Sequence, residues 1–176
     1  MSKIPAAAGA SMTMKSYGNR ASPGARPGLI NVPHDALPCC LRVTCYDHEE
    51  VVDYEGCDLE KVQQLRGKHA VTWIDITGLG SAALIASVGE MFGLHRLALE
   101  DVVNIPQRSK VEHYGAVAFA IDQLLRLTKK YDVEQISFFA GKDSVLTWRE
   151  RPSDCFDSVR ERIHSTGQEG DLVNGC

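Results

Sequence analysis

The sequence has no long hydrophobic run and no strong net charge. A membrane-spanning helix needs about 20 consecutive apolar residues, whereas the longest clean apolar run is Ala116–Ile121, which has the length of a strand. The formal net charge of -4 gives no general attraction to nucleic acid or to anionic lipid. We therefore expect a globular chain of about one domain that binds no nucleic acid and does not itself contact a membrane.

Cysteine is present, but not in a pattern that builds a site. The six cysteines follow no secretory segment, and a domain of this size needs no disulfides, so we expect reduced thiols in the cytoplasm. A zinc site made by His34, Cys39, Cys40 and Cys45 is the alternative. Neither the Cys-x-x-Cys nor the His-x-x-x-His spacing of zinc sites occurs, however. The spacing favours free thiols.

Composition divides the chain into three parts. Residues 1–38 are rich in Ala, Gly, Ser and Pro, with no acidic residue before Asp35, and they bury too little apolar surface to fold alone. We expect a flexible leader there and a folded α/β domain over residues 39–165. A disordered C-terminal tail is expected over residues 166–176, where Gly167 and Gly170 interrupt helical periodicity.

Hydrophobic periodicity predicts a mixed β-sheet flanked by helices. Strand patterns cover residues 41–47, 49–55, 70–77, 134–140 and 144–149, and an extended stretch with a break at Gly115 covers residues 110–127. Helical patterns cover residues 59–65, the segment between Ser81 and Gly93, residues 95–103, and a last helix that Ser153 should cap and in which Arg160 should face solvent. This order is typical of an α/β protein with helices on at least one face of the sheet.

A glycine turn precedes the second predicted helix. The stretch GLGSAA, residues 78–83, matches Gly-x-Gly-x-x-Ala between a strand and a helix, where helix amides can bind phosphate. A dinucleotide fold would place an acid at the end of a second parallel strand about 20 residues on, whereas Glu100 and Asp101 lie in a predicted helix. A tight turn into a helix capped by Ser81 is the better interpretation.

No group of residues has the spacing of a catalytic site. His95, His113, Glu100, Asp101 and the cysteines could supply acid–base groups. No Gly-x-Ser-x-Gly, His-Glu-x-x-His or Cys/His signature accompanies them. We therefore expect that the protein is not an enzyme.

Glu100 and Asp101 stand together on one short helix. Leu99, Val102 and Val103 form its apolar side and turn both acids toward its polar side, where neighbouring side chains diverge by about 100°. Each acid can then face its own partner, which suits Mg²⁺, because this ion keeps several waters and takes one or two carboxylates at a site. Adjacent acids on a helix are more often solvated surface, so the residues alone leave both interpretations open.

Several collinear stretches resemble the cytosolic N-terminal domain of CorA-type magnesium and cobalt transporters. They are VTWIDITGL, FGLHRLALEDVVNIPQRSKVE and ISFFAGKDSVLTWRERPSDCFDSVRERI, and the resemblance covers about Leu41 to Ile163. The most specific piece is the Leu-Glu-Asp helix followed by Gln-Arg at residues 107–108 and Lys-Val-Glu at residues 110–112. Ser109 is a departure, because the family usually has proline there.

The resemblance implies an α/β/α sandwich in the funnel wall of a homopentameric channel. Glu100 and Asp101 match the family's regulatory metal ligands, so Mg²⁺, with Co²⁺ as a second cation, is implied to bind there between subunits and to hold the pore closed. At low Mg²⁺ the carboxylates left facing each other would repel. Divalent cations are the expected partners, and a pentamer is expected only in the full-length protein, at the cytoplasmic face of the cell membrane.

These 176 residues lack the family's stalk helix, its two membrane spans and its Gly-Met-Asn signature. We therefore expect no transport and only weak Mg²⁺ binding by this chain, which by itself would be cytoplasmic. One hypothesis is a fragment or truncated product that is the cation-sensing domain of a CorA-like transporter. The other is a stand-alone soluble α/β module of the same fold without transport activity. A third hypothesis, a nucleotide-binding enzyme, is supported only by the glycine turn.

Overall fold

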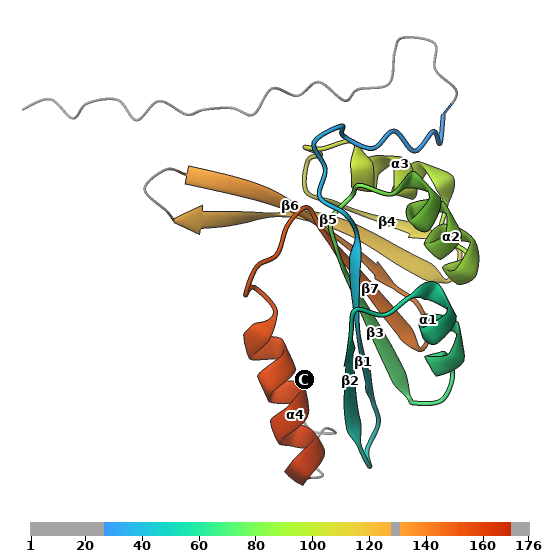
Figure 1. The fold of residues 1–176 in the computed structure, drawn as a ribbon, viewed down its shortest axis with the longest axis vertical. Coiled ribbons are helices and arrows are strands. Elements are labelled where there is room, and N and C mark those ends of the chain that lie inside the picture. The colour runs from blue at the N-terminus through green and yellow to red at the C-terminus, as the bar shows by residue number, and fades with distance from the viewer. Residues whose placement is uncertain (1–26, 128–130, 170–176) are drawn as a thin grey trace, which may run out of the picture.

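The computed structural model describes residues 27–127 and 131–169, which form one mixed seven-stranded sheet with helices on both faces (Figure 1). The strands are β1 (Cys40–Tyr46), β2 (Val51–Glu55), β3 (Val71–Thr77), β4 (Lys110–Tyr114), β5 (Val117–Leu127), β6 (Tyr131–Ala140) and β7 (Ser144–Arg149). The helices are α1 (Leu59–Leu65), α2 (Ala82–Phe92), α3 (Arg96–Val103) and α4 (Asp157–Glu169). The predicted α/β class is confirmed.

The sheet has the strand order β2-β1-β3-β7-β6-β5-β4. Every neighbouring pair is antiparallel except β3 and β7, which run parallel with Thr72 opposite Ser144. Helices α1, α2 and α3 cover one face of the sheet and α4 lies on the other, so that the molecule is an α/β/α sandwich (Figure 1). The extended stretch predicted over residues 110–127 is two strands, β4 and β5, which the turn at Gly115 joins as a hairpin.

The main hydrophobic core lies between the sheet and helices α1 to α3. Alternate residues of the strands point into it because side chains alternate between the two faces of a sheet. The buried members from the strands include Leu41, Val43, Ile74, Ile76, Phe119, Ile121, Phe139, Leu146 and Trp148, and those from the helices include Val62, Leu65, Ile85, Val88, Leu99 and Val102. This packing fixes the orientation of α3, and therefore the direction in which its polar side faces.

The opposite face of the sheet is polar where α4 covers it. Trp73 of β3 meets Phe156 edge to face, with ring centroids 5.4 Å apart. The Arg160 guanidinium lies 4.1 Å from the centre of the Trp73 ring. On this face, therefore, aromatic rings and arginines take the place of an aliphatic core.

Two predictions about the last helix are wrong. Ser153 does not cap it, because α4 begins at Asp157, and the hydroxyl and carbonyl of Ser153 instead accept hydrogen bonds from Nη1 of Arg149 at 2.9 and 2.8 Å. Arg160 does not face solvent but is 5% exposed. Val159 takes the exposed position instead. The sheet beneath the helix is polar, so a guanidinium fits there better than an isopropyl group.

The described part of the predicted leader, residues 27–38, contains no helix or strand but contacts the domain. Ile30, Val32 and Ala36 pack against the core, and the carbonyl oxygen of Leu37 accepts from the Gly80 amide at 2.8 Å. Residues 1–26 of the leader and residues 170–176 of the predicted tail lie outside the described residues. Within the described ranges no helix has both the length and the apolar character needed to cross a membrane.

Candidate metal centre

Helix α3 carries both predicted metal ligands. His95 begins it, with Nδ1 accepting the Leu97 amide at 3.3 Å, and the helix ends at Asn104 before Pro106, whose ring nitrogen cannot donate a helical hydrogen bond. Its buried residues are Ala98, Leu99, Val102 and Val103. The polar side of α3, with Glu100 and Asp101, consequently faces away from the core, as the periodicity predicts.

The two acids have different partners inside the chain. Oε2 of Glu100 accepts the backbone amide of Gly28 at 2.6 Å, which ties the segment before β1 to α3. Oδ2 of Asp101 accepts from the Lys110 ammonium of β4 at 2.7 Å. Each acid therefore faces its own partner, in keeping with the divergence of neighbouring side chains on a helix.

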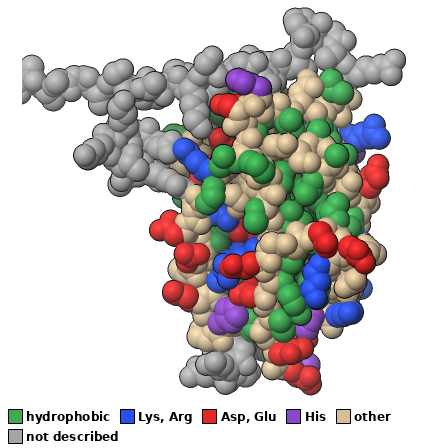
Figure 2. Space-filling model, in the orientation of Figure 1, with side chains coloured by type: hydrophobic (Ala, Val, Ile, Leu, Met, Phe, Trp, Pro, Cys, Tyr) green, Lys and Arg blue, Asp and Glu red, His purple; other side chains and the backbone are tan. Residues whose placement is uncertain are grey.

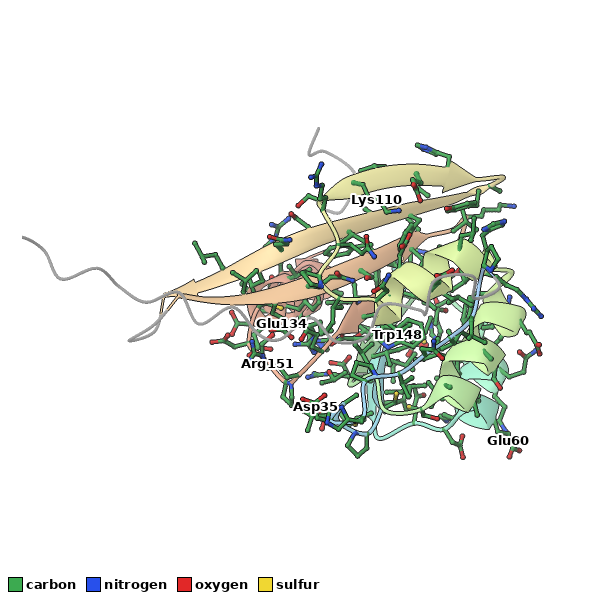
Figure 3. All side chains as sticks on the ribbon, turned by 90° about the horizontal axis from the view of Figure 1, so that it is seen from above. Asp35, Glu60, Lys110, Glu134, Trp148 and Arg151 are labelled. Carbon is green, nitrogen blue, oxygen red and sulfur yellow. The ribbon has the colours of Figure 1, made fainter. Side chains whose placement is uncertain are left out.

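Lys110 connects α3 to the edge of the sheet. Its Nζ also lies 3.0 Å from Oε1 of Glu112, the next residue on the same face of β4. Oε2 of Glu112 accepts in turn from the Tyr114 hydroxyl at 2.8 Å. One ammonium is thus shared by two carboxylates, and Lys110 stands at the strand edge next to α3 (Figure 3).

Charge and burial shift the pKa values of Lys110, Glu112 and Tyr114, which these contacts connect. Burial disfavours the charged Lys110 ammonium, but hydrogen bonds to Asp101 and Glu112 outweigh it and raise the pKa of Lys110. Hydrogen bonds from Tyr114 and Lys110 lower the pKa of Glu112. Burial and the bond to Glu112 raise the pKa of Tyr114. Lys110 and Glu112 are accordingly both charged at neutral pH.

The donor set of α3 fits a hydrated magnesium ion. Oδ1 of Asp101 and Oε1 of Glu100 accept no hydrogen bond from the described residues, so each carboxylate keeps one oxygen for an outside partner. Hard oxygen ligands, one or two per site, are what Mg²⁺ takes when it retains its waters. Nowhere in the described ranges do three His, Cys, Asp or Glu side chains converge for a metal, so the remaining ligands would be water or another molecule.

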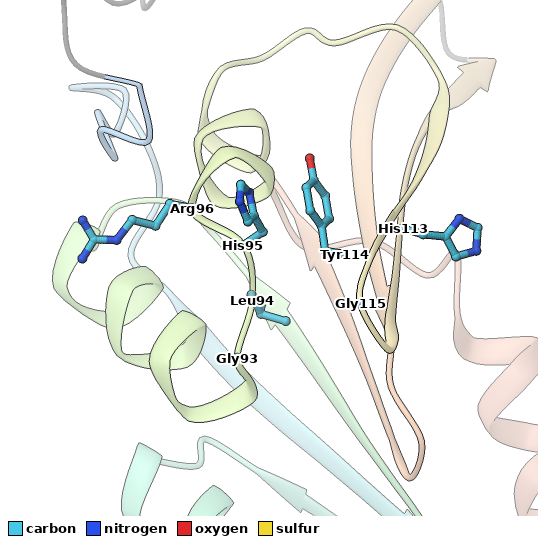
Figure 4. Close-up of a pocket in the computed structure, with 7 residues that line it drawn as sticks. All are labelled: Gly93, Leu94, His95, Arg96, His113, Tyr114 and Gly115. Carbon is cyan, nitrogen blue, oxygen red and sulfur yellow. The ribbon is translucent and has the colours of Figure 1, made fainter.

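A hollow of about 610 Å³ lies beside α3, between its first turn and the β4–β5 turn (Figure 4). The rings of His95 and Tyr114 stack there, with centroids 4.4 Å apart and planes 7° apart. His113 points away from them on the other side of the hairpin (Figure 4). The two histidines that could have formed an acid–base pair are therefore not brought together.

The glycine turn is occupied by the chain's own backbone. The Gly80 amide donates to the Leu37 carbonyl and the Gly78 amide to the Arg149 carbonyl, both at 2.8 Å. Ser81 caps α2 as predicted, with its hydroxyl accepting from the Leu84 amide at 3.2 Å. Because these glycine amides are already used, the turn has little left to offer a phosphate.

The residues of the alternative zinc site are not gathered. Cys45 is fully buried in the core, Cys40 is exposed, and the Cys39 thiol donates to the Gly78 carbonyl at 3.3 Å. Burial raises the pKa of both the Cys39 and Cys45 thiols, which opposes formation of the thiolate that zinc requires. The five described cysteines are free thiols.

A second charged cluster is buried under α4. Asp75 of β3 accepts from Nη2 of Arg149 and from Nη2 of Arg160, each at 2.7 Å, and from the Thr147 hydroxyl, also at 2.7 Å. Nη1 of Arg160 donates to the Thr44 hydroxyl at 2.6 Å. The cluster fastens α4 to three strands of the sheet.

Some of these charged residues could be recognised in part from the sequence. An aspartate inside the apolar strand VTWIDIT must find a partner when buried, which could have drawn attention to Asp75. Lys110 and Glu112 alternate along a strand and so share one of its faces. Nothing in the sequence pattern, however, brings Lys110 to Asp101, because that contact depends on how α3 packs.

Comparison with known proteins agrees with the fold. The full-length CmaX protein superimposes with a TM-score of 0.54 at 16% identity, covering 72% of this chain and 38% of that one. The CorA magnesium transporter of Methanocaldococcus jannaschii gives a TM-score of 0.52 at 9% identity, covering 77% and 40%. At these identities the likeness defines the fold alone, an α/β/α domain of this architecture.

Sequence comparison defines the family. The profile of the family described as "CorA-like Mg2+ transporter protein" matches residues 68–174. The "Cobalt/magnesium transport protein CorA" of Thermotoga maritima is 37% identical over 126 residues, which are 70% of this chain and 36% of that protein. The "Putative metal ion transporter YfjQ" of Bacillus subtilis is 28% identical over 94 residues, 53% of this chain and 29% of that protein. The chain belongs to the CorA-like family and spans about a third of the length of these relatives.

Proposed function

We propose that this chain is the cation-sensing domain of a CorA-like magnesium and cobalt transporter, placed at the cytoplasmic face of the membrane in the full-length protein. Membership of the family supports this proposal, since the Thermotoga maritima relative is named a cobalt/magnesium transport protein. The observation that carries it is the pair Glu100 and Asp101 on the outward side of α3, each with a carboxylate oxygen left for a ligand.

In this proposal Mg²⁺ or Co²⁺ bridges α3 of one subunit to oxygens of the next in a pentamer. The ion favours the closed ring only by binding it more tightly than the open one. Loss of the ion leaves the acidic seam uncompensated, so that neighbouring subunits repel. The residues of this chain hold the ion and respond to it, and conduction belongs to other parts of the transporter.

Neutralising both acids is expected to abolish stabilisation of the chain by Mg²⁺. At ten times the Kd, one bound ion raises the free energy of unfolding by about 1.4 kcal/mol, and Glu100→Gln with Asp101→Asn should remove this gain. Thermal unfolding with and without MgCl₂ at constant ionic strength measures it. Glu49→Gln with Glu50→Gln, an exposed acidic pair at the β1–β2 turn, is the matched control. Equal Mg²⁺ stabilisation in both variants would contradict the assignment.

The same pair can be tested in an intact relative. Amide substitutions at the corresponding acids of a full-length transporter are expected to weaken the protection from proteolysis that Mg²⁺ gives, because charge is lost from the subunit seam.

The isolated chain is expected to be monomeric or weakly associating. A ring of such domains would need the stalk and pore to hold it together, and a bridging ion alone supplies few contacts. Multi-angle light scattering at several concentrations measures the mass. A stable pentamer would show that the domain carries its own assembly surface.

The alternative is a stand-alone α/β module without transport activity. The ion pair between Lys110 and Asp101 favours it, because the chain neutralises this carboxylate without any metal. If calorimetric titration detects binding of neither Mg²⁺ nor Co²⁺, this alternative is supported.

A further inference from the structure

We propose that Lys110 is a tethered cation that competes with the divalent ion for Asp101 and thereby sets the ion concentration at which the site fills. The inference rests on the proposed function, because it concerns the same carboxylate. The contact between Lys110 of β4 and Asp101 of α3 is nevertheless a separate observation from the family membership that supports the proposed function.

The geometry holds the ammonium at the site. Nζ of Lys110 lies 2.7 Å from Asp101 and 3.0 Å from Glu112, and 5.7 Å from the centre of the buried Phe119 ring. The side chains of Lys110 and Asp101 are only 29% and 21% exposed, so water screens their attraction less than at an open surface. The Tyr114 hydroxyl fixes Glu112 in turn.

Electrostatic repulsion prevents the Lys110 ammonium and the divalent ion from binding Asp101 at the same time. An ammonium and a dication a few ångströms apart repel strongly at the effective dielectric of a protein surface, so the full charge of Asp101 is available to one of them at a time. The ammonium is part of the chain, which gives it an effective concentration in the millimolar range or above. Trace divalent ions therefore do not replace it, whereas millimolar Mg²⁺ does.

Glu112 gives the displaced ammonium a place to go. When an ion takes Asp101, Lys110 keeps its contact with Glu112, so the exchange leaves no charge without a partner. Lys110 thus has two positions, shared between both acids or held by Glu112 alone. The choice between them follows the divalent concentration.

Removal of the competitor is the first test. Lys110→Met is expected to lower the Kd for Mg²⁺ by about tenfold, within the range typical of coupled sites. Lys68→Met, which removes the same charge from an exposed position beyond α1, should leave the Kd unchanged. Calorimetric titration with MgCl₂ at constant ionic strength gives each Kd, and far-UV circular dichroism verifies folding.

The second test should change the Kd for Mg²⁺ in the opposite direction. Glu112→Gln leaves Asp101 as the only carboxylate for Lys110, so the Kd should rise severalfold, and this rise should shrink in the Lys110→Met background. General damage to the fold would weaken binding in both single variants, which separates it from competition.

The outcomes distinguish the two proposals. An unchanged or higher Kd in Lys110→Met, with binding lost in Asp101→Asn, overturns the competition and leaves the cation site intact. Binding that is equal in the wild type and in Glu100→Gln with Asp101→Asn overturns the site itself, and the competition with it.

Discussion

Replacing Asp75 by alanine is expected to destabilise the protein by about 3–5 kcal/mol, because it removes the carboxylate that two buried guanidinium groups share. Asp75 is 2% exposed, and the two arginines bonded to it, Arg149 and Arg160, are 7% and 5% exposed. Burial lowers the pKa of Arg160, although the charge of Asp75 opposes that shift. Without the carboxylate both guanidinium groups must move toward water, and α4 should separate from β3.

Urea denaturation followed by tryptophan fluorescence measures this loss, since Trp73 lies directly under Arg160. Glu55→Ala is the control, because Glu55 is 73% exposed in its ion pair with Arg42 and exposed pairs contribute about 0–1 kcal/mol. The loss of unfolding free energy in Asp75→Asn should lie between those of Asp75→Ala and Glu55→Ala, since asparagine keeps hydrogen-bonding atoms but not the charge. A loss below about 1 kcal/mol for Asp75→Ala would mean that the arginines find solvent without disturbing α4.

Replacing Gly78 by alanine is expected to cost about 3 kcal/mol or more. Gly78 has φ +91°, where a side chain is strained, and a Cβ there would overlap the Pro38 carbonyl oxygen and lie 2.7 Å from that of Leu37. Left-handed strain alone costs about 1–2 kcal/mol, and displacing the adjacent backbone adds the cost of overpacking, about 1–3 kcal/mol. The segment before β1 would have to leave the turn.

Gly56→Ala separates these two costs. Gly56 also has positive φ, +64°, but a Cβ there meets nothing within 4 Å, so Gly56→Ala should lose only the strain part, about 1–2 kcal/mol. Urea denaturation compares the two variants, and limited proteolysis near residues 27–38 tests whether the segment is released in Gly78→Ala. Equal losses in the two variants would show that this packing contributes nothing.

Both predictions concern how the domain is held together, and both affect the candidate site indirectly. The segment that packs on Gly78 continues back to Gly28, whose amide binds Glu100. A variant that releases this segment should therefore also free an oxygen of Glu100. Mg²⁺ titration of Gly78→Ala would reveal whether the segment restrains the acid.

Local patterns predicted the elements well because their causes are local. Alternation in residues 41–47 and the apolar run of residues 70–77 correspond to β1 and β3, since side-chain period follows directly from strand geometry. Ser81 and Gly93 bound α2 as predicted, because capping involves atoms only a few residues apart. The outward direction of Glu100 and Asp101 follows from the apolar residues on the other side of α3, which face the core.

Contacts that the helix pattern does not include were the source of both errors about α4. The helix pattern places Arg160 at the surface because it cannot reveal that the sheet beneath carries Asp75, which is 85 positions away in the sequence. The pattern predicts Ser153 as the cap because a serine hydroxyl can accept from the first amides of a helix, but in the structure this hydroxyl accepts from Arg149. Hydrogen-bonding groups choose among all partners within reach, and only folding decides which partners those are.

Residue types and their spacing along the chain are enough to predict the order and type of the elements, the α/β class, the family resemblance and the side of α3 on which two acids stand. Three features depend instead on how the elements pack: Lys110 neutralises Asp101, Asp75 fastens α4, and the backbone of residues 37 and 38 fills the glycine turn. Electrostatic and steric contacts act through space over a few ångströms, and the residues that make them are distant in the sequence.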